Sequence, residues 1–512
     1  MSDSNVWYKL TRNTASNLLG ALVPIVIGFF MMPLIVNRIG AAAYGVWLLA
    51  NSVVGYMGII DLGLGPTVTK KTAEYLATGA EDKLNRVLST AFTLYLGLGV
   101  VIATIILSLA PVIPSLFHTD PQQAPQLRLV LVIIGMEAAT GFPFSVFGGV
   151  LQGLQDFHIR NLITVQNAIL RLISTITLLS LGYGLISLLL LEFVLSAISW
   201  ILQVFWIKRR VPQLKLSPRL YDSSELKLLF KFSGAMMLWR VAGLTIARAN
   251  RIIIAMFLPV SNVTLFEVGT KTAEWPRTGI SSFLWPLLPA SSELSAQREK
   301  ASMKDVYLTG TKFVLAFYLA TGGALFFWGA EFISLWMGKQ FTAAVSLMYI
   351  LLLGNLYQSQ NVVAHVMLAG MGVLKAFTRV MASYPVVNLI LAIFLTKTFG
   401  LLGIAWAVTL TFIILETYLT TQVLKVFGVS YFELLSTCYL PSLISIVPAA
   451  TVAYVLHQVM TVASWERLAA VTGTFVAMFA ATFWVVGVSK DEKRSLQTNL
   501  QAFVKRPSVT RV

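Results

Sequence analysis

Residues 161–206 read NLITVQNAILRLISTITLLSLGYGLISLLLLEFVLSAISWILQVFW. The stretch contains two apolar runs, 161–181 and 184–206, with only a short turn around Gly182 between them. A helix that crosses a bilayer needs roughly 20 mostly apolar residues. Because the turn is so short, the second helix must run back alongside the first. The stretch therefore predicts a transmembrane helical hairpin.

The same pattern recurs along the whole chain and predicts about 14 spans of bilayer length. We place them near residues 14–36, 42–64, 88–110, 126–150, 161–181, 184–206, 233–258, 261–288, 310–330, 341–369, 378–396, 401–424, 438–458 and 467–488. Many of the connections between them are only turns, so most neighbouring helices are expected to be antiparallel.

Composition agrees with a membrane protein. Of the 512 residues, 57% are hydrophobic and 12% are charged, about half the usual quarter for a soluble protein, and the mean hydropathy is +0.77. Soluble enzymes, disordered chains and disulfide scaffolds are thereby excluded. Cys438 is the single cysteine, and the four histidines lack metal-ligand spacing, so we expect no metal site and no cofactor.

The net charge of +16 follows from the positive-inside rule, because cytoplasmic loops collect Lys and Arg. With both termini cytoplasmic, the inner loops and tails carry 25 basic residues and the outer loops carry 5. This asymmetry fixes the orientation and accounts for the charge without a nucleic-acid partner.

A basic cytoplasmic linker divides the first twelve spans into two sets of six. The halves resemble each other: Val150–Gly153 begins a stretch that recurs from Met367, 217 positions later, and Pro66…Glu74 resembles Pro286…Glu293. We predict an all-α polytopic membrane protein with two six-helix lobes related by a pseudo-twofold axis along the membrane normal. The predicted parts are an N-lobe (1–207), the linker (208–226), a C-lobe (227–427), two extra helices (428–489) and a basic tail (490–512).

Four motifs carry a family resemblance: Leu34–Trp47 (LIVNRIGAAAYGVW), Asp61–Gly65 (DLGLG), Lys71–Gly79 (KTAEYLATG) and Gly149–Phe157 (GVLQGLQDF). They resemble the polysaccharide transporter family, the Wzx-type lipid-linked oligosaccharide flippases of the MATE/MurJ superfamily. The resemblance implies a transporter in the bacterial or archaeal inner membrane. It would move an undecaprenyl-pyrophosphate-linked O-antigen or exopolysaccharide unit outward by alternating access. It also implies a monomer that works beside the glycan polymerase or assembly machinery of lipopolysaccharide synthesis.

Charges at membrane depth mark the candidate site, because a charge at a helix centre costs about 2.5–3.5 kcal/mol on insertion scales. The basic residues placed there are Arg171, Arg240, Arg248, Arg251, Lys271 and Arg277. On a helical wheel the three arginines of span 7 form one stripe within about 80°. One interpretation is that these residues form structural ion pairs with acids of span 8, such as Glu267 with Lys271. Arg171 could likewise pair with Glu192.

The alternative interpretation is a water-filled cationic cavity between the lobes. Five bases on spans 7 and 8 exceed two acids there, and guanidinium groups bind phosphate oxygens bidentately. A pyrophosphate headgroup is then the expected occupant, with Asn250, Thr270 and Trp275 as candidate glycan contacts at similar depth.

Acidic residues within the spans predict sites for a coupling ion, and prolines there predict kinks in the helices. Asp61, Glu267 and Glu274 are candidate sites for a coupling ion, either H⁺ or Na⁺. Pro66, which follows a run of glycines in span 2, and Pro276 within span 8 are expected to kink their helices. Interrupted helices of this kind point to transport sites.

Two other functions stay open at this point. A MATE-type antiporter of small molecules would share the architecture, but an exporter of cations would need an acidic cavity. A membrane-embedded glycan polymerase or ligase would need a sizeable outer loop, and the longest one here is about 110–126. The sequence also lacks a Walker A motif, which argues against ATP as the energy source. We therefore expect a secondary transporter and not an enzyme.

Overall fold

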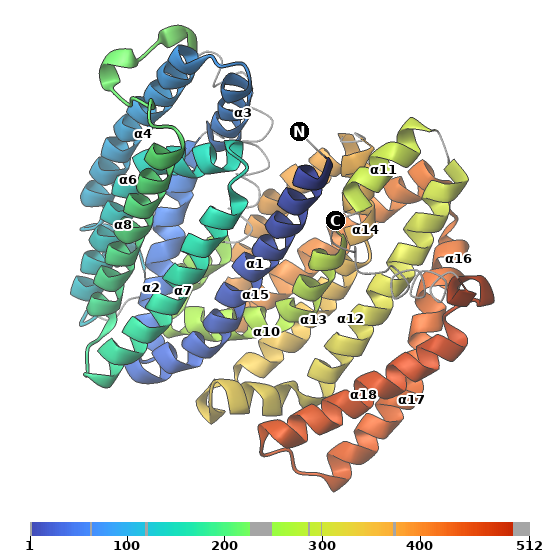
Figure 1. Cartoon of the computed structure of the whole chain (residues 1–512). Helices are drawn as coiled ribbons and strands as arrows, with labels where there is room; N and C mark the ends of the chain where they lie inside the picture. The colour runs from blue at the N-terminus through green and yellow to red at the C-terminus, as the bar shows by residue number, and fades with distance from the viewer. Residues whose placement is uncertain are drawn as a thin grey trace. The chain divides into compact units, whose positions relative to one another are not determined.

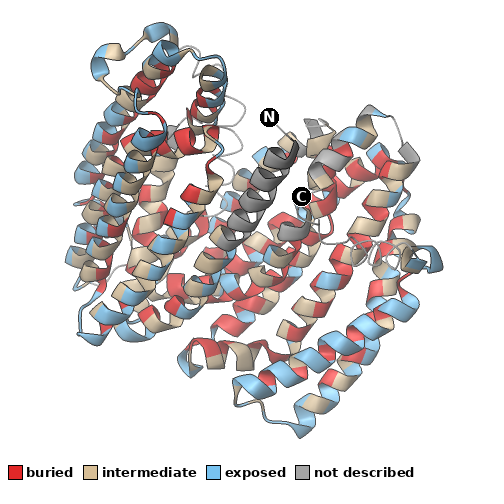
Figure 2. Ribbon diagram, in the orientation of Figure 1, coloured by how far each residue is buried: buried red, intermediate tan, exposed pale blue. Residues whose placement is uncertain are grey.

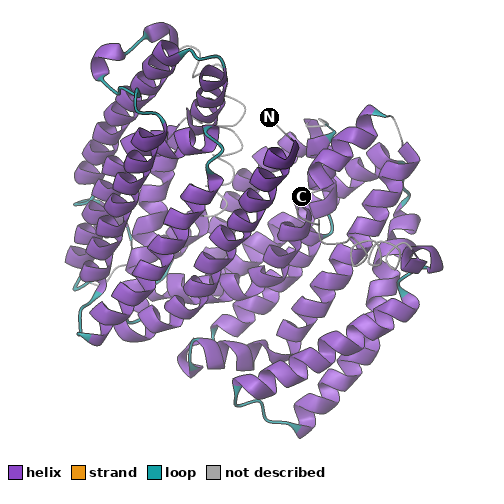
Figure 3. Ribbon diagram, viewed as in Figure 1, coloured by secondary structure: helices purple, strands orange, loops and turns teal. Residues whose placement is uncertain are grey.

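The structure is a computed structural model that describes residues 3–61, 64–117, 121–225, 248–284, 287–297, 300–371 and 375–494. In this part of the chain every regular element is a helix (Figure 3). Nine helices there are long and apolar enough to cross a membrane. Large apolar side chains such as Phe30 and Ile201 are 61% and 66% exposed on these helices, which suits surfaces that face lipid.

The chain divides into two compact units, residues 1–267 with 384–404 and residues 268–383 with 405–512. The first unit contains the helices that precede the linker and a helical stretch at 248–257. Its elements are α1 (Asp3–Ile39), α2 (Ala41–Gly55), η1 (Tyr56–Asp61), α3 (Leu64–Ala77), α4 (Glu81–Leu109), α5 (Ile113–Leu116), α6 (Ala124–Gly153), α7 (Phe157–Ser180), α8 (Leu185–Arg210) and η2 (Pro218–Leu220) (Figure 1).

The second unit contains most of the later helices. The elements after the linker are α10 (Ser261–Leu284), α11 (Leu287–Ala296), α12 (Lys300–Trp336), η3 (Lys339–Phe341), α13 (Ala344–Ser359), α14 (Val362–Gly370), α15 (Lys375–Phe427), α16 (Tyr431–Leu434), π-helical η4 (Leu435–Tyr439), α17 (Leu440–Val459) and α18 (Trp465–Val486). Two of them, α10 and α15, contribute residues to both units.

Some predicted spans have different boundaries in the structure. The predicted span 42–64 is interrupted: α2 ends at Gly55, the 3-10 helix η1 follows, and α3 begins at Leu64. Gly55 and Gly58 lie at this break, where glycine weakens a continuous α-helix. By contrast, α10 continues as a helix through Pro276, because neighbouring helices can compensate for the missing backbone donor.

Glycine also separates the predicted spans 378–396 and 401–424, which both fall within α15. Gly400 has φ 58 and ψ −135, a conformation outside the helical region. A Cβ placed on Gly403 would collide with the carbonyl oxygen of Leu395. Residues eight apart are far from each other in a continuous helix, so the chain turns sharply at Gly400.

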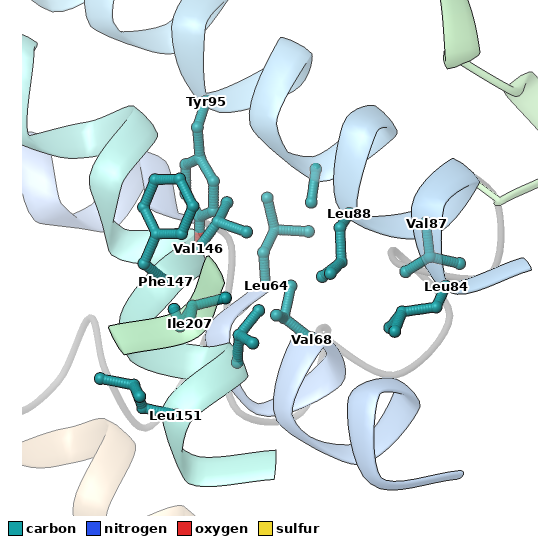
Figure 4. Close-up of a cluster of buried hydrophobic side chains, with 12 residues drawn as sticks. Leu64, Val68, Leu84, Val87, Leu88, Tyr95, Val146, Phe147, Leu151 and Ile207 are labelled. Atoms are coloured by element: carbon teal, nitrogen blue, oxygen red, sulfur yellow. The ribbon is translucent and has the colours of Figure 1, made fainter. Parts of the chain in front are cut away.

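The core of the first unit lies between α3, α4, α6 and α8. Leu64 and Val68 of α3 meet Leu88 of α4 and Leu151 of α6, all of them fully buried or nearly so (Figure 4). The close approach of α3 to α6 depends on glycine: a Cβ on Gly149 would lie 2.8 Å from Val68 Cγ1. This packing holds α3 in a fixed position beside the bundle.

The second unit has its own core between α12, α17 and α18. Trp328, at a non-helical position of α12, is fully buried. It packs against Phe475 of α18 with ring centroids 6.2 Å apart. Alanines at 449 and 453 supply the small faces of α17 in this cluster. Within each unit, buried residues occupy the faces that helices turn toward one another (Figure 2).

The linker after α8 is anchored along α4. The backbone N–H of Lys215 donates to Asn85 Oδ1 at 2.9 Å, and that of Asp222 donates to Thr90 Oγ1 at 3.0 Å. The N–H of Ser217 donates to Ser89 Oγ at 3.1 Å. Polar side chains on the first turns of α4 therefore bind the part of the linker that the structure describes.

Candidate functional site

A cavity of about 1080 Å³ lies inside the first unit. It is bounded by α1, α3, α4, α6, α7 and α8, and the α3–α6 packing described above forms one of its corners. The cavity is of the size that holds organic ligands in proteins. Its lining residues divide into three chemical kinds: cations, neutral polar groups and aromatic rings.

Three cations line the cavity: Lys70 of α3, and Arg160 and Arg171 of α7. No Asp or Glu is among the described residues that line it. Positions 160, 164, 167 and 171 follow the helical repeat, so α7 presents these polar side chains along one face. The cavity is therefore electropositive and suits an anion.

The neutral polar groups are mainly amides and hydroxyls. Gln152, Asn167 and Gln203 come from three different helices. Asn167 Nδ2 donates to Ser199 Oγ at 2.7 Å, whereas Asn167 Oδ1 is buried and accepts no hydrogen bond from the described residues. Amides and hydroxyls of this kind exchange hydrogen bonds with a polyhydroxylated ligand.

An aromatic surface completes the cavity. Phe144 and Trp200 are stacked, with ring centroids 5.0 Å apart and an interplanar angle of 8°. A Cβ on Gly141 would come within 2.8 Å of Trp200 Cζ2, so the missing side chain lets the indole lie against α6. Rings provide rigid apolar area against which the apolar face of a sugar can pack.

The motif at Gly149–Phe157 builds the corner of this cavity. Gly149 and Gly153 allow α3 to approach α6, since a Cβ on Gly153 would lie 2.6 Å from Thr72 Cβ. Gln152 faces the cavity between them. Asp156 Oδ2 and Arg210 Nε form an ion pair, 3.2 Å apart, which ties the end of α8 to the start of α7.

Arg171 also contacts an acidic residue that does not line the large cavity. Its Nη2 forms an ion pair with Glu192 Oε2 of α8, which is one of the two arrangements that the sequence left open. Arg171 also lines the large cavity of the first unit. A separate cavity of about 430 Å³ is lined by Glu137, Arg171 and Glu192.

The predicted stripe on span 7 is described only in part. Arg251 pairs with Glu267, with Nη2 and Oε2 2.7 Å apart. Arg248 Nη1 donates to the carbonyl oxygen of Asn51, and a Cβ on Gly55 would overlap the Arg248 guanidinium. The Arg251–Glu267 contact is an ion pair of the kind that the structural interpretation describes, whereas Arg248 contacts a backbone carbonyl. Arg240 lies outside the described residues.

The remaining predicted residues are spread over several environments. Lys271 and Glu274 form a 3.8 Å pair with side chains 49% and 35% exposed. Arg277 binds Gln358. Asp61 ends η1, and its side chain lies outside the described residues. Pro66 is in the first turn of α3 and lines the large cavity.

The three predicted glycan contacts have different immediate surroundings. Asn250 is buried, and its Oδ1 accepts no hydrogen bond from the described residues. Thr270 Oγ1 is also buried, and it forms no hydrogen bond with the described residues. Trp275 packs edge-on against Phe332, with ring centroids 4.9 Å apart. With Pro276 it lines an apolar cavity of about 420 Å³ between α10, α12 and α18.

Sequence reasoning missed Lys70 and Arg160, because it assigned both to cytoplasmic loops. In the structure α3 is a helix packed on the bundle, and Arg160 is in the first turn of α7. The signal that could have found Arg160 is its spacing from Arg171, with polar residues at 164 and 167 on the same helical face. Trp200 and Gln203 carry no comparable signal.

Comparison of the sequence with protein families gives one match: a family model described as polysaccharide biosynthesis protein covers residues 35–346. The chain is 24% identical over 520 residues to the uncharacterized membrane protein EpsK of Bacillus subtilis, covering 95% of this chain and 97% of that protein. It is 24% identical to a probable low-salt glycan biosynthesis flippase, Agl15, of Haloferax volcanii, covering 79% and 81% of the two chains. It is 20% identical to a candidate O-antigen transporter of Shigella flexneri, covering 78% and 94%.

Solved structures show the same fold. The lipid II flippase MurJ in an inward closed conformation superposes with a TM-score of 0.69 at 14% identity, covering 93% of this chain and 98% of that one. An inward-facing multidrug resistance MATE transporter of the MOP superfamily gives 0.65 at 16% identity, covering 81% and 99%. The helical architecture is thus that of the MATE and MurJ transporters.

Proposed function

The chain belongs to the family of polysaccharide biosynthesis proteins, and we propose that it is a flippase that moves a lipid-linked oligosaccharide across the membrane in which it is embedded. It is a transporter and not an enzyme. The observation that carries the proposal is the electropositive cavity of the first unit, where Lys70, Arg160 and Arg171 lie beside amides and stacked rings. Such a lining suits a ligand that joins phosphate to sugar.

The phosphate part of the ligand is assigned to the cations. A pyrophosphate carries several charged oxygens, and each charge-assisted hydrogen bond to Arg or Lys is worth about 1.5–3 kcal/mol. The sugars are assigned to Gln152, Asn167 and Gln203 and to the surface of Trp200. An undecaprenyl-pyrophosphate-linked O-antigen or exopolysaccharide unit has both parts.

The finer features of the transporter are also proposals. We propose about 14 spans in two six-helix lobes with two further helices, both termini in the cytoplasm of a bacterial or archaeal cell, and a monomer coupled to H⁺ or Na⁺. The short helices α3 and α11 support the internal repeat, because they carry the matched residues Glu74 and Glu293. Arg240, Lys271 and Arg277 remain proposed additional headgroup contacts. Arg248 and Arg251, which contact the Asn51 carbonyl and Glu267, are proposed to have structural roles.

The antiporter alternative shares the fold but fits the cavity less well. A carrier of organic cations would need carboxylates where this cavity has three cations. Among the described lining residues of the large cavity there is no acid. The likeness to the MATE structure therefore supports the architecture and not the substrate.

The direct test is transport by purified protein in liposomes that contain an undecaprenyl-pyrophosphate-linked oligosaccharide. Flipping is followed as protection of the glycan from an added glycosidase. We expect the double variant Lys70→Ala, Arg160→Ala to lower the rate by at least roughly tenfold, because two headgroup contacts are lost. Arg209→Ala is the matched control, since Arg209 lies over Trp206 near the end of α8 and does not line the cavity. An unchanged rate in the double variant would contradict the assignment.

The aromatic surface has a separate test. We expect Trp200→Ala to weaken binding of the glycosylated lipid while undecaprenyl pyrophosphate without sugar binds as before, since the ring is assigned to the sugar. Trp206→Ala serves as the control, because Trp206 does not line the cavity. Equal losses for the two ligands would show that Trp200 supports the fold of the cavity and not the sugar.

A further inference from the structure

Arg171 lies at the boundary between two cavities of the first unit. It lines the large cavity with Lys70 and Arg160, and it lines the smaller one with Glu137 and Glu192. Its side chain is 43% exposed, whereas that of its partner Glu192 is 13% exposed. The guanidinium can therefore serve either cavity through a change in its own side-chain torsions.

Among the described residues that line the smaller cavity, acids outnumber bases. They include two carboxylates, Glu137 and Glu192, and one arginine, Arg171. Ser196, one turn after Glu192 on α8, donates to Glu137 Oε1 at 2.6 Å, but a hydroxyl does not compensate a charge. Two carboxylates that share one site repel each other, and charges at membrane depth are costly. One bound proton makes the cluster neutral.

In the part of the chain that the structure describes, the other helices around this cluster bring no second cation into the cavity. Of the described lining residues, α2 contributes Tyr44 and Asn51 as polar groups, and α1 contributes the apolar or small Gly28, Met31, Met32 and Ile35. Tyr44 also lies within electrostatic reach of Arg251 and Glu267. Those two residues neutralise each other at 2.7 Å.

We propose that Glu137, Arg171 and Glu192 form a proton site, and that protonation releases Arg171 from Glu192 to the anionic headgroup in the large cavity. The release of Arg171 to the headgroup rests on the proposed function. The proton comes from water and binds a carboxylate oxygen; no covalent bond of the ligand changes. Because coupling between two sites is reciprocal, proton binding strengthens headgroup binding and the headgroup strengthens proton binding.

A proton suits this site better than a sodium ion. Na⁺ needs several oxygen ligands around it, and here a guanidinium lies directly on Glu192. That positive charge repels a metal cation and does not hinder protonation of a carboxylate. The geometry thus selects the proton from the two coupling ions that the sequence left open.

The proton site is tested without any substrate, by infrared titration of the purified full-length protein. We expect a protonated-carboxyl band that grows as the pH falls and is missing in Glu192→Gln or in Glu137→Gln. Glu466→Gln is the control, because Glu466 is on the exposed first turn of α18. A difference spectrum identical in all three variants would overturn the proton site, and so would a band that disappears when sodium replaces potassium.

Release of Arg171 is tested with inorganic pyrophosphate as the probe. At alkaline pH we expect Glu192→Gln to bind the probe roughly tenfold more tightly than the wild type, and the two affinities to converge as the pH falls. The ratio of the two affinities cancels the titration of pyrophosphate itself. Equal affinities at every pH would overturn the release step and leave the flippase standing. No binding to either protein would instead reject the cavity as the phosphate site.

Discussion

At the scale of single residues, most charges at membrane depth that the structure describes are engaged with a partner. Arg251 and Glu267 illustrate this, with side chains only 20% and 6% exposed. A buried pair contributes little net stability, but removing one partner leaves an uncompensated charge and costs about 3–5 kcal/mol. The exposed pair Lys271–Glu274, 3.8 Å apart, should be worth at most about 1 kcal/mol.

The Arg251–Glu267 pair gives a prediction on stability. We expect Arg251→Ala to lower the melting temperature of the detergent-solubilised protein strongly, and Arg251→Ala with Glu267→Gln to recover most of the loss, because the double variant leaves no unpaired charge. Lys271→Ala is the control for loss of one positive charge and should change little. If Arg251→Ala instead keeps its melting temperature and loses transport, Arg251 contacts the substrate.

At the scale of elements, two segments outside the predicted spans are ordered in the structure and pack on helices of the first unit. The segment between the second and third predicted spans contains α3, which glycines of α6 allow to pack closely. The basic linker, expected only as a divider between lobes, is bound along α4 by side chains of that helix. Both segments are too polar to be recognised as packed elements from hydropathy.

The linker contact can be measured by hydrogen exchange. Asn85 Oδ1 accepts from the N–H of Lys215 at 2.9 Å, and a hydrogen bond of this kind contributes about 1 kcal/mol. We therefore expect Asn85→Ala to speed exchange of the peptide containing Lys215 roughly fivefold. Thr104→Ala is the matched control on the same helix, since Thr104 bonds the Val100 carbonyl of its own helix. Equal exchange in both variants would show that the linker is held by other contacts.

At the scale of the whole molecule, orientation in the membrane is a property of the charge distribution. The 25 basic residues assigned to the inner side and the 5 assigned to the outer side predict cytoplasmic termini. The family match agrees with the polysaccharide family that the sequence motifs indicated, and the likeness to the MATE and MurJ structures agrees with the predicted helical fold. They leave the orientation itself to experiment.

Topology is tested by reporter fusions at two positions. A fusion after Val112, which follows α4, should report the outside, and one after Pro212, which follows α8, should report the inside. The reason is the positive charge at Lys208, Arg209 and Arg210, which keeps that loop in the cytoplasm. The reverse pattern would overturn the orientation and the assignment of the linker.

The sequence by itself determined the class of fold and the class of function. Long apolar runs can satisfy their backbone hydrogen bonds within a bilayer only as helices, so span length alone identifies an all-helical membrane protein. The motifs at Leu34–Trp47 and Gly149–Phe157 indicated the family, and the family match confirms that resemblance. Both signals come from residues that are close together in the sequence, so they can be recognised without the structure.

Only the tertiary structure decided which charges share a space. Lys70 of α3 and Arg160 of α7 line one cavity although they are 90 positions apart in the sequence, and nothing in their local patterns relates them. Conversely, the sequence left open whether Arg251 is paired or faces a cavity, and the fold places Glu267 at 2.7 Å from it. Whether a charge is compensated depends on distances within a few ångströms across helices. Packing between helices sets those distances, and periodicity along one helix does not.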